Sequence, residues 1–119
     1  MQFPYQQLYV NGELTDACHR TRHTVTNPAT EEPVAEIAWA SEHDCEQALL
    51  AAEKGFHLWK QTPIEERVAW MLKLRAQVLR EAEHLREAIM HEMGKPWKAT
   101  LEDIESLTDS LEFYANEIT

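Results

Sequence analysis

Glycine is scarce in this sequence. The three glycines, Gly12, Gly55 and Gly94, lie far apart in a chain of 119 residues. None of them begins a GxGxxG or GxxxxGK pattern, which are the loops whose backbone amides cradle phosphate groups. The sequence therefore has no readable nucleotide-binding loop, and we assign no cofactor-binding residue to it.

Cysteines and long apolar runs are also few. Cys18 and Cys45 are the two cysteines, and they do not resemble a disulfide framework. No apolar run is long enough to span a membrane, and the first residues, MQFPYQQ, lack the charged and apolar regions of a signal peptide. We therefore expect a cytoplasmic protein with reduced thiols and no membrane partner.

Basic residues are outnumbered. The chain has 11 Lys and Arg against 21 Asp and Glu, which gives a net charge of −10. A phosphate-backbone partner needs a basic patch, so this balance argues against nucleic-acid binding. No Lys or Arg follows Lys98, and the acidic run from Glu102 to Glu112 is best interpreted as a solvated helix face.

The first forty residues predict short antiparallel strands. Asn11 and Gly12 tolerate positive φ, so they predict a tight hairpin turn after the apolar residues 8–10. Asn27 and Pro28 begin a second turn. The expected order is strand 8–10, turn 11–12, strand 13–14, loop 15–23, strand 24–26, turn 27–30 and strand 33–40.

The longest periodic stretch runs from Thr62 to Gly94. Thr62 in the N-cap position, Pro63 in the first helical position and Glu65 predict a capping box. Gly94 can take the left-handed conformation that ends a helix, and the proline two residues later prevents continuation. We therefore predict one helix over residues 62–93, about 45 Å long at 1.5 Å per residue.

Two further helices are predicted over residues 41–59 and 97–116. Ser41 is an N-cap, with Asp44 in the capping-box position where Glu or Gln is usual. Apolar residues recur at helical spacing in all three helices and predict buried stripes. In the first and third helices these stripes are Cys45, Ala48, Leu49, Ala52, Phe56 and Trp59, and Leu101, Ile104, Leu107, Leu111, Phe113 and Tyr114.

The middle helix carries the longest stripe. It comprises Ile64, Val68, Met71, Leu72, Arg75, Val78, Leu79, Ala82, Leu85, Ile89 and Met93. Trp70 lies off this stripe, so we expect it to meet another element or an exposed interface.

Strands followed by helices predict an α+β fold, or a piece of a larger one. Three apolar stripes need covering, whereas the strands are short and few, and an isolated hairpin is marginally stable. We therefore expect residues 1–119 to form a single partial domain that packs against further polypeptide.

Few residues suggest chemistry. His19 and His23 have a metal-binding spacing on a helix, but they lie in a predicted loop with only Cys18 nearby. Cys18 could act as a nucleophile with one of these imidazoles as its base, although no oxyanion site is readable. A small metal or thiol enzyme is therefore one alternative, and Cys45 is interpreted as a core residue.

Five landmarks occur in an order that resembles the aldehyde dehydrogenase superfamily. They are Tyr9-Val10-Asn11-Gly12-Glu13, Asn27-Pro28-Ala29-Thr30 with Val34-Ala35-Glu36-Ile37, the helix from Ala48 to Trp59, Glu66-Arg67, and Glu92-Met93-Gly94-Lys95-Pro96. Each is weak alone, but together they cover nearly the whole chain. The sequence is most similar to the bacterial branch that includes the semialdehyde dehydrogenases.

The resemblance implies an enzyme that oxidises an aldehyde to a carboxylic acid with NAD or NADP. In the family, the nucleophilic cysteine, the glutamate base, the oxyanion site and the cofactor-binding residues lie beyond the segment that this chain resembles. We therefore carry no catalytic role onto Cys18 or Cys45. The family also binds a structural cation near this region, which implies Asp103 as a ligand, with Thr26 or Asn27 as a neighbour.

The resemblance further implies a scaffold and assembly surface that is inactive alone. It corresponds to the outer N-terminal part of the cofactor domain, whose partners are the remainder of the enzyme chain and further copies in a homo-oligomer. A second hypothesis is a helical module that self-associates through residues 62–93 or 97–116 without catalysis. Uncovered apolar stripes motivate it, because association buries them.

Overall fold

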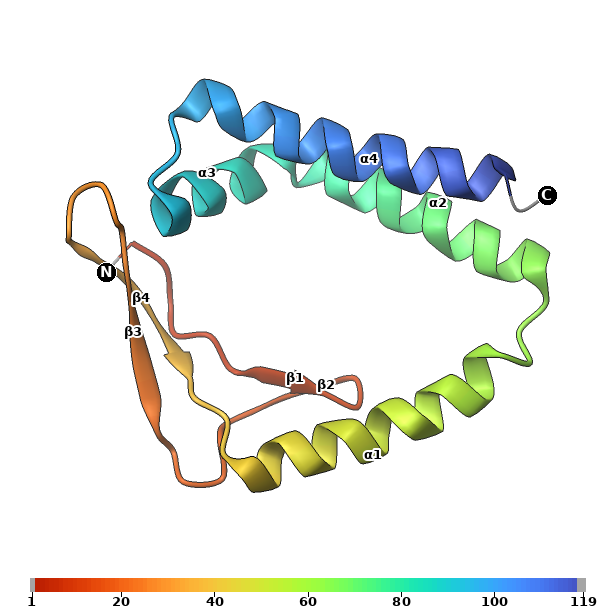
Figure 1. Ribbon diagram of the computed structural model, residues 1–119, viewed down its shortest axis with the longest axis horizontal. Helices are drawn as coiled ribbons and strands as arrows, with labels where there is room; N and C mark the ends of the chain where they lie inside the picture. The colour runs from red at the N-terminus through yellow and green to blue at the C-terminus, as the bar shows by residue number, and fades with distance from the viewer. Residues whose placement is uncertain (1, 118–119) are drawn as a thin grey trace. The chain divides into compact units, whose positions relative to one another are not determined.

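The computed structural model describes residues 2–117, and the chain divides into two compact units, residues 1–61 and residues 62–119 (Figure 1). The first unit contains four strands and one helix, and the second contains helices alone. The predicted α+β order, antiparallel strands followed by helices, is confirmed. Among the described residues, none of the helices has both the length and the hydropathy that a membrane span requires.

The first hairpin pairs β1 (Leu8–Val10) with β2 (Glu13–Thr15) in antiparallel register. Its turn is the predicted one, because Asn11 and Gly12 have φ values of 55° and 82°. Positive φ at both central residues matches the turn to the twist of the strands.

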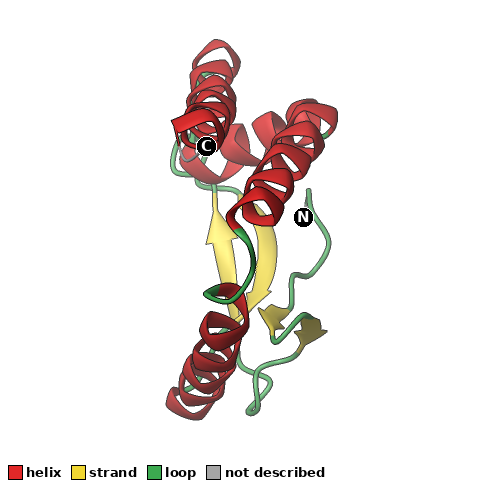
Figure 2. Cartoon of the chain, turned by 90° about the vertical axis from the view of Figure 1, so that its right-hand side faces the viewer, coloured by secondary structure: helices red, strands yellow, loops and turns green. Residues whose placement is uncertain are grey.

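The second hairpin pairs β3 (Arg22–Thr26) with β4 (Pro33–Ala38), the longest strands in Figure 2. In the connecting turn, the Asn27 side-chain oxygen accepts a hydrogen bond of 2.9 Å from the Ala29 backbone N–H, which confirms the predicted turn. The strand begins two residues earlier than the sequence indicates, because residues 22 and 23 pair with the end of β4.

The core of the first unit lies around β4. Its outer edge is covered by the N-terminal segment, where the Gln6 N–H donates to Glu36 O at 2.9 Å and the Ala38 N–H donates to Gln6 O at 2.8 Å. Val34 and Ala35 are adjacent in sequence and each is only 3% exposed, so both faces of this strand are covered.

Helix α1 (Glu42–Trp59) begins at its predicted cap. The Asp44 N–H donates to Ser41 Oγ at 3.2 Å, and the Ser41 N–H donates to Asp44 Oδ2 at 2.8 Å. The prediction that one stripe of α1 is buried is wrong within this unit, because α1 has no buried residue and Leu49 is 71% exposed. The three-residue strand β1, its main contact, is too short to cover an 18-residue helix.

The predicted single helix over residues 62–93 is two helices, α2 (Ile64–Arg80) and α3 (Ala82–Met93). Glu81 separates them with φ −98° and ψ 10°, outside the helical region, although its N–H still donates to Gln77 O at 3.0 Å. The bend lets α3 leave the line of α2 and meet the residues that precede the last helix. Neither glycine nor proline marks the bend, so the sequence did not indicate it.

The N-terminal cap of this stretch also differs from the prediction. Pro63, not Thr62, occupies the N-cap position, with φ −53° and ψ 149°, and it forms no side-chain cap. Proline has no side-chain oxygen that could act as a cap, and the helix begins at Ile64, two residues after the start of the predicted range 62–93. The other end is as predicted, because Gly94 ends α3 with φ 65°.

The predicted last helix, residues 97–116, begins as a short 3₁₀ helix, η1 (Trp97–Ala99), and continues as α4 (Thr100–Glu117). α4 lies along α2 and α3 (Figure 1). Its buried residues are mostly small: Thr100, Ile104, Thr108 and Ala115. Small side chains allow the helix axes to approach closely, which leaves Leu101, Leu107, Phe113 and Tyr114 of the predicted stripe exposed.

Candidate functional site

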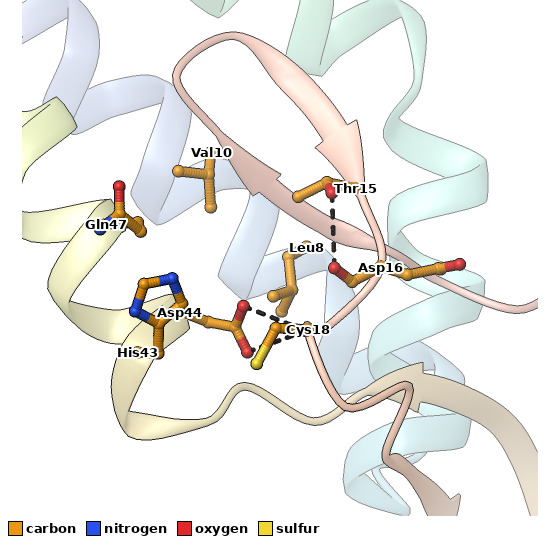
Figure 3. Close-up of a pocket in the computed structure, with 8 residues that line it drawn as sticks. All are labelled: Leu8, Val10, Thr15, Asp16, Cys18, His43, Asp44 and Gln47. Atoms are coloured by element: carbon orange, nitrogen blue, oxygen red, sulfur yellow. Dashed lines mark hydrogen bonds between the residues drawn. The ribbon is translucent and has the colours of Figure 1, made fainter.

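A pocket of about 320 Å³ lies in the first unit between the β1–β2 hairpin and the N-terminal turn of α1 (Figure 3). Cys18 is one wall of it. The Cys18 backbone N–H donates to both Asp44 oxygens, at 3.1 and 3.2 Å, and its Sγ lies 3.1 Å from Ser41 Oγ. The N-cap of α1 therefore holds Cys18 in place.

Asp44 is the central acceptor in this arrangement. Hydrogen bonds from the Ser41 backbone and side chain, and then from Cys18, favour its ionised form and lower the pKa of its carboxyl group. A carboxylate beside a thiol does not supply the positive charge that activates a nucleophilic cysteine. The geometry around Cys18 is therefore that of a helix cap rather than a thiol active site.

Asp16 forms a second cluster at the edge of the same pocket. Its Oδ1 accepts from Tyr5 OH at 3.0 Å and from Gln7 Nε2 at 3.1 Å. The bond from Gln7, followed by that from Tyr5, lowers the pKa of the Asp16 carboxyl group. Arg22 lies 4.1 Å above the Tyr5 ring. These contacts join the N-terminal segment to β3 and to the residue that follows β2, and both hydrogen bonds end on Asp16 Oδ1.

The histidines named by the sequence do not gather around Cys18. His23 lies on β3 with its ring centroid 4.6 Å from that of Trp39, and His19 is exposed in the preceding turn. Over residues 2–117, no group of three or more His, Cys, Asp and Glu side chains is arranged to hold a metal ion. Cys45, which the sequence placed in the core, is exposed.

Asp103, the predicted cation ligand, lies in the first turn of α4 and accepts two hydrogen bonds from Lys95 Nζ, at 2.9 and 2.8 Å. Thr26 is the last residue of β3 and belongs to the other unit, as does its neighbour Asn27. A cation at Asp103 would compete with the Lys95 ammonium group. The cation site stays a prediction.

Arg86 stabilises the turn between α3 and α4 through contacts with Trp97 and Thr100. Its Nε donates to Thr100 Oγ1 at 3.1 Å, its guanidinium donates to Trp97 O at 3.0 Å, and it lies 4.0 Å above the Trp97 ring. Thr100 Oγ1 in turn donates to Trp97 O at 2.8 Å and is fully buried. This contact was not predicted, because its members are eleven to fourteen residues apart and match no motif.

Trp70 lies on an open side of α2, as its position off the apolar stripe indicated. It is 49% exposed and lines a hollow of about 230 Å³ with Leu74 and Gln77. Lys73 Nζ lies 4.4 Å from the Trp70 ring centroid. The side chains around this hollow suit the binding of polypeptide better than catalysis, because none of them can act as a nucleophile beside a base.

Comparisons of sequence and of structure with known proteins both find similarity to aldehyde dehydrogenases. The model of the aldehyde dehydrogenase family matches residues 14–119. The chain is 31% identical over 107 residues to the 3,6-anhydro-alpha-L-galactose dehydrogenase of Vibrio sp. (strain EJY3). This match covers 90% of this chain and 22% of the relative. It is 34% identical over 112 residues to 1-pyrroline-5-carboxylate dehydrogenase 2 of Bacillus subtilis (strain 168), covering 93% of this chain and 21% of the relative.

Solved structures agree. The NADP-dependent glyceraldehyde-3-phosphate dehydrogenase of Bacillus halodurans C-125, complexed with NADP, superposes with a TM-score of 0.91 at 26% identity, over 95% of this chain and 24% of that one. A 3,6-anhydro-L-galactose dehydrogenase structure superposes with a TM-score of 0.88 at 28% identity, over 94% and 24% of the two chains. The chain thus spans less than a quarter of the length of these relatives.

Proposed function

The chain belongs to the aldehyde dehydrogenase family, and from this premise we propose that it supplies the outer N-terminal part of such an enzyme as a scaffold and assembly surface that is inactive alone. The observation that carries the proposal is the match of residues 14–119 to the family, together with superposition of 95% of the chain on one quarter of a family enzyme. In this proposal the two units belong to one partial domain of the larger enzyme.

The proposed reaction of the whole enzyme is oxidation of an aldehyde to a carboxylic acid. NAD or NADP would accept the hydride, and the structures of relatives that carry NADP support this choice. The chain's own glycines do not fit a phosphate loop, because Gly12 lies in a hairpin turn, Gly94 ends α3 and Gly55 is inside α1. We therefore place the cofactor site and the reacting groups in polypeptide outside this segment.

The structure supports the absence of a catalytic role for the two thiols. Cys18 is held by the α1 cap next to a carboxylate, and Cys45 is exposed on α1. We expect the isolated chain to produce no NADH or NADPH from an aldehyde. NAD(P) reduction that is lost in Cys18→Ser or Cys45→Ser would contradict the proposal.

A chimeric enzyme tests whether this chain can supply the N-terminal scaffold of a family enzyme. Residues 1–119 replace the matched segment of the Vibrio 3,6-anhydro-alpha-L-galactose dehydrogenase, and NAD(P) reduction with aldehyde is compared with that of the parent. We expect the chimera to oxidise the aldehyde, whereas the relative without its N-terminal segment does not. A folded but inactive chimera would count against the scaffold role.

The proposed assembly is a homo-oligomer of the full-length enzyme in the cytoplasm, with a structural cation at Asp103 and Thr26. The alternative is self-association of this chain without catalysis. Several half-exposed apolar residues on α2 and α4 favour it, among them Leu72, Leu79 and Leu107. Light scattering across a range of concentrations decides the alternative, because a strictly monomeric folded chain excludes it.

A further inference from the structure

One edge of β4 is covered by the extended segment that precedes β1. We call this segment, residues 2–7, the strap. Gln6 forms a parallel bridge with Ile37, and its main chain forms two hydrogen bonds with β4. Nearer the start of the strap, the Phe3 N–H donates to Val34 O at 3.1 Å. The strap therefore provides main-chain partners along β4, whose other edge pairs with β3.

Without the strap, β4 would be an edge strand that pairs readily with another strand. Its sequence, PVAEIA, contains a single charged residue, Glu36, and that carboxylate is paired with Arg22 of β3 at 3.2 Å. Charged side chains, especially lysine, and prolines keep edge strands from pairing with other chains. The proline of β4 is its first residue, so the rest of the strand offers its N–H and C=O groups to any strand that reaches them.

The outer side of the strap is a poor template for a further strand. Pro4, in the middle of the strap, has no N–H to donate. Its carbonyl oxygen accepts a hydrogen bond of 2.9 Å from Gln6 Nε2. At Pro4 the outer side therefore offers no donor, and its acceptor is already engaged. The strap pairs with β4 on one side and discourages pairing on the other.

Two side chains of the strap converge on Asp16, which directly follows β2. Asp16 Oδ1 accepts from Tyr5 OH at 3.0 Å and from Gln7 Nε2 at 3.1 Å. Arg22 lies 4.1 Å above the Tyr5 ring. We call the two hydrogen bonds to Asp16 the latch. Because both end on one oxygen atom, a single substitution removes them together.

Hydrogen bonds, rather than apolar burial, hold the strap in place. Phe3 and Tyr5 are half-buried, and the other four residues of the strap are exposed. A segment that buries so little apolar surface opens locally while the rest of its unit stays folded. The latch therefore contributes a large share of what keeps the strap closed.

We propose that the strap is an autoinhibitory cover, which the latch on Asp16 keeps closed and which prevents β4 from pairing with β4 of a second copy. A second copy is the occupant that the strap excludes, because a two-fold antiparallel pair gives each open edge an identical partner. Association through the apolar side chains of α2 and α4 leaves the strap closed, and this difference separates the two routes to self-association.

Amide hydrogen exchange at two positions reports the state of the strap. The Gln6 N–H, on the strap, donates to Glu36 O at 2.9 Å, and the Ala38 N–H, on β4, donates to Gln6 O at 2.8 Å. Both hydrogen bonds break when the strap opens. When β4 then pairs with a second copy, the Ala38 N–H is protected again and the Gln6 N–H is not.

Substitutions in the latch provide the first test, in protein dilute enough to be monomeric by light scattering. Asp16→Ala removes both hydrogen bonds and should raise the exchange rates of the Gln6 and Ala38 amides about tenfold. Tyr5→Phe removes one of them and should raise both rates about threefold. Asp16→Asn keeps an oxygen that can accept both hydrogen bonds and should largely restore the parent rates.

The matched control for Tyr5→Phe is Tyr9→Phe, because Tyr9 is a tyrosine of β1 that is 73% exposed. We expect Tyr9→Phe to leave the exchange rates of both amides unchanged. If Asp16→Ala leaves them unchanged as well, the latch does not hold the strap and the proposal is wrong.

Self-association provides the second test, by light scattering across a range of concentrations. We expect the apparent dissociation constant for pairing through β4 to fall about a hundredfold in Asp16→Ala, because the strap of each copy is open about ten times more often. Tyr5→Phe, the milder substitution, should lower it about tenfold for the same reason. This second variant provides the comparison if Asp16→Ala does not fold.

Amide exchange of the associated variant assigns the route. Protection of the Ala38 amide with fast exchange at Gln6 is the expected result for pairing through β4. Protection of both amides means that the copies associate through another surface with the strap closed, which overturns the proposal. An open strap in a variant that associates no more than the parent chain also overturns it, because β4 is then exposed without pairing.

Discussion

Helices α1 and α4 have the same length, 18 residues, and are covered very differently within their units. α4 buries four residues against α2 and α3, whereas α1 buries none and meets mainly the short strand β1. Both helices are amphipathic in sequence. The difference teaches that an apolar stripe in the sequence does not by itself predict how far a helix is buried within its own unit.

The largest expected effect is the difference in unfolding free energy between truncating an apolar side chain on α4 and truncating one on α1. Ile104 on α4 is 5% exposed, so Ile104→Ala removes buried surface and leaves a cavity that costs about 3 kcal/mol. Leu49 on α1 is 71% exposed, and Leu49→Ala should change the free energy of unfolding by less than about 0.5 kcal/mol. Urea denaturation followed by circular dichroism measures both.

Equal losses at these two positions would show that α1 is covered in solution by something beyond the first unit. Repeating Leu49→Ala in the chimera separates the cases. A larger cost there than in the isolated chain would place the partner of α1 in the rest of the enzyme.

The next effect concerns the buried hydroxyl at the start of α4. Thr100→Val keeps the shape of the side chain but removes the acceptor of the Arg86 Nε hydrogen bond, which should cost about 2 kcal/mol. Ser110→Ala, which removes an exposed hydrogen bond to Ser106 O on the same helix, is the matched control and should cost less than about 0.5 kcal/mol. Thermal unfolding compares them, and similar costs would mean that Arg86 finds another acceptor.

Local signals in the sequence predicted the two hairpin turns, the N-cap of α1 and the C-terminal end of α3, whereas the capping box predicted at Thr62 was wrong. Asn11 with Gly12, Ser41 with Asp44, and Gly94 are each governed by the backbone conformation of a few adjacent residues. Such features depend on the chain within one turn, so a single sequence contains the information they need.

The errors share a different cause. The bend at Glu81 and the small-residue contacts of α4 depend on which helices meet, and the apolar stripe of α1 stays uncovered because its own unit offers only a short strand beside it. The sites in the second unit were predicted in part. Trp70 departs from the apolar period and could be noticed in the sequence, whereas Arg86, Trp97 and Thr100 come together from positions that match no motif.

The cap of α1 provides a smaller effect. Ser41→Ala removes the oxygen that accepts from the Asp44 N–H and should destabilise the helix by about 1 kcal/mol. Ser41→Gly should cost only a few tenths of a kcal/mol, because glycine is tolerated at the N-cap. Amide exchange in the first turn of α1 measures the effect, and equal protection in the alanine variant and the parent would exclude the cap as the anchor of this turn.

The smallest effect is the response of this same cap to acid. Hydrogen bonds from Ser41 and Cys18 hold the pKa of Asp44 below its usual value of 3.8, so the carboxylate stabilises the folded state at neutral pH. That contribution is complete above the usual pKa and is lost as the pH falls through the lower pKa of the folded state. We expect protection of the Cys18 and Ser41 amides, corrected for intrinsic exchange, to decrease as the pH drops below about 4. Asp44→Asn should remove the pH dependence of this protection.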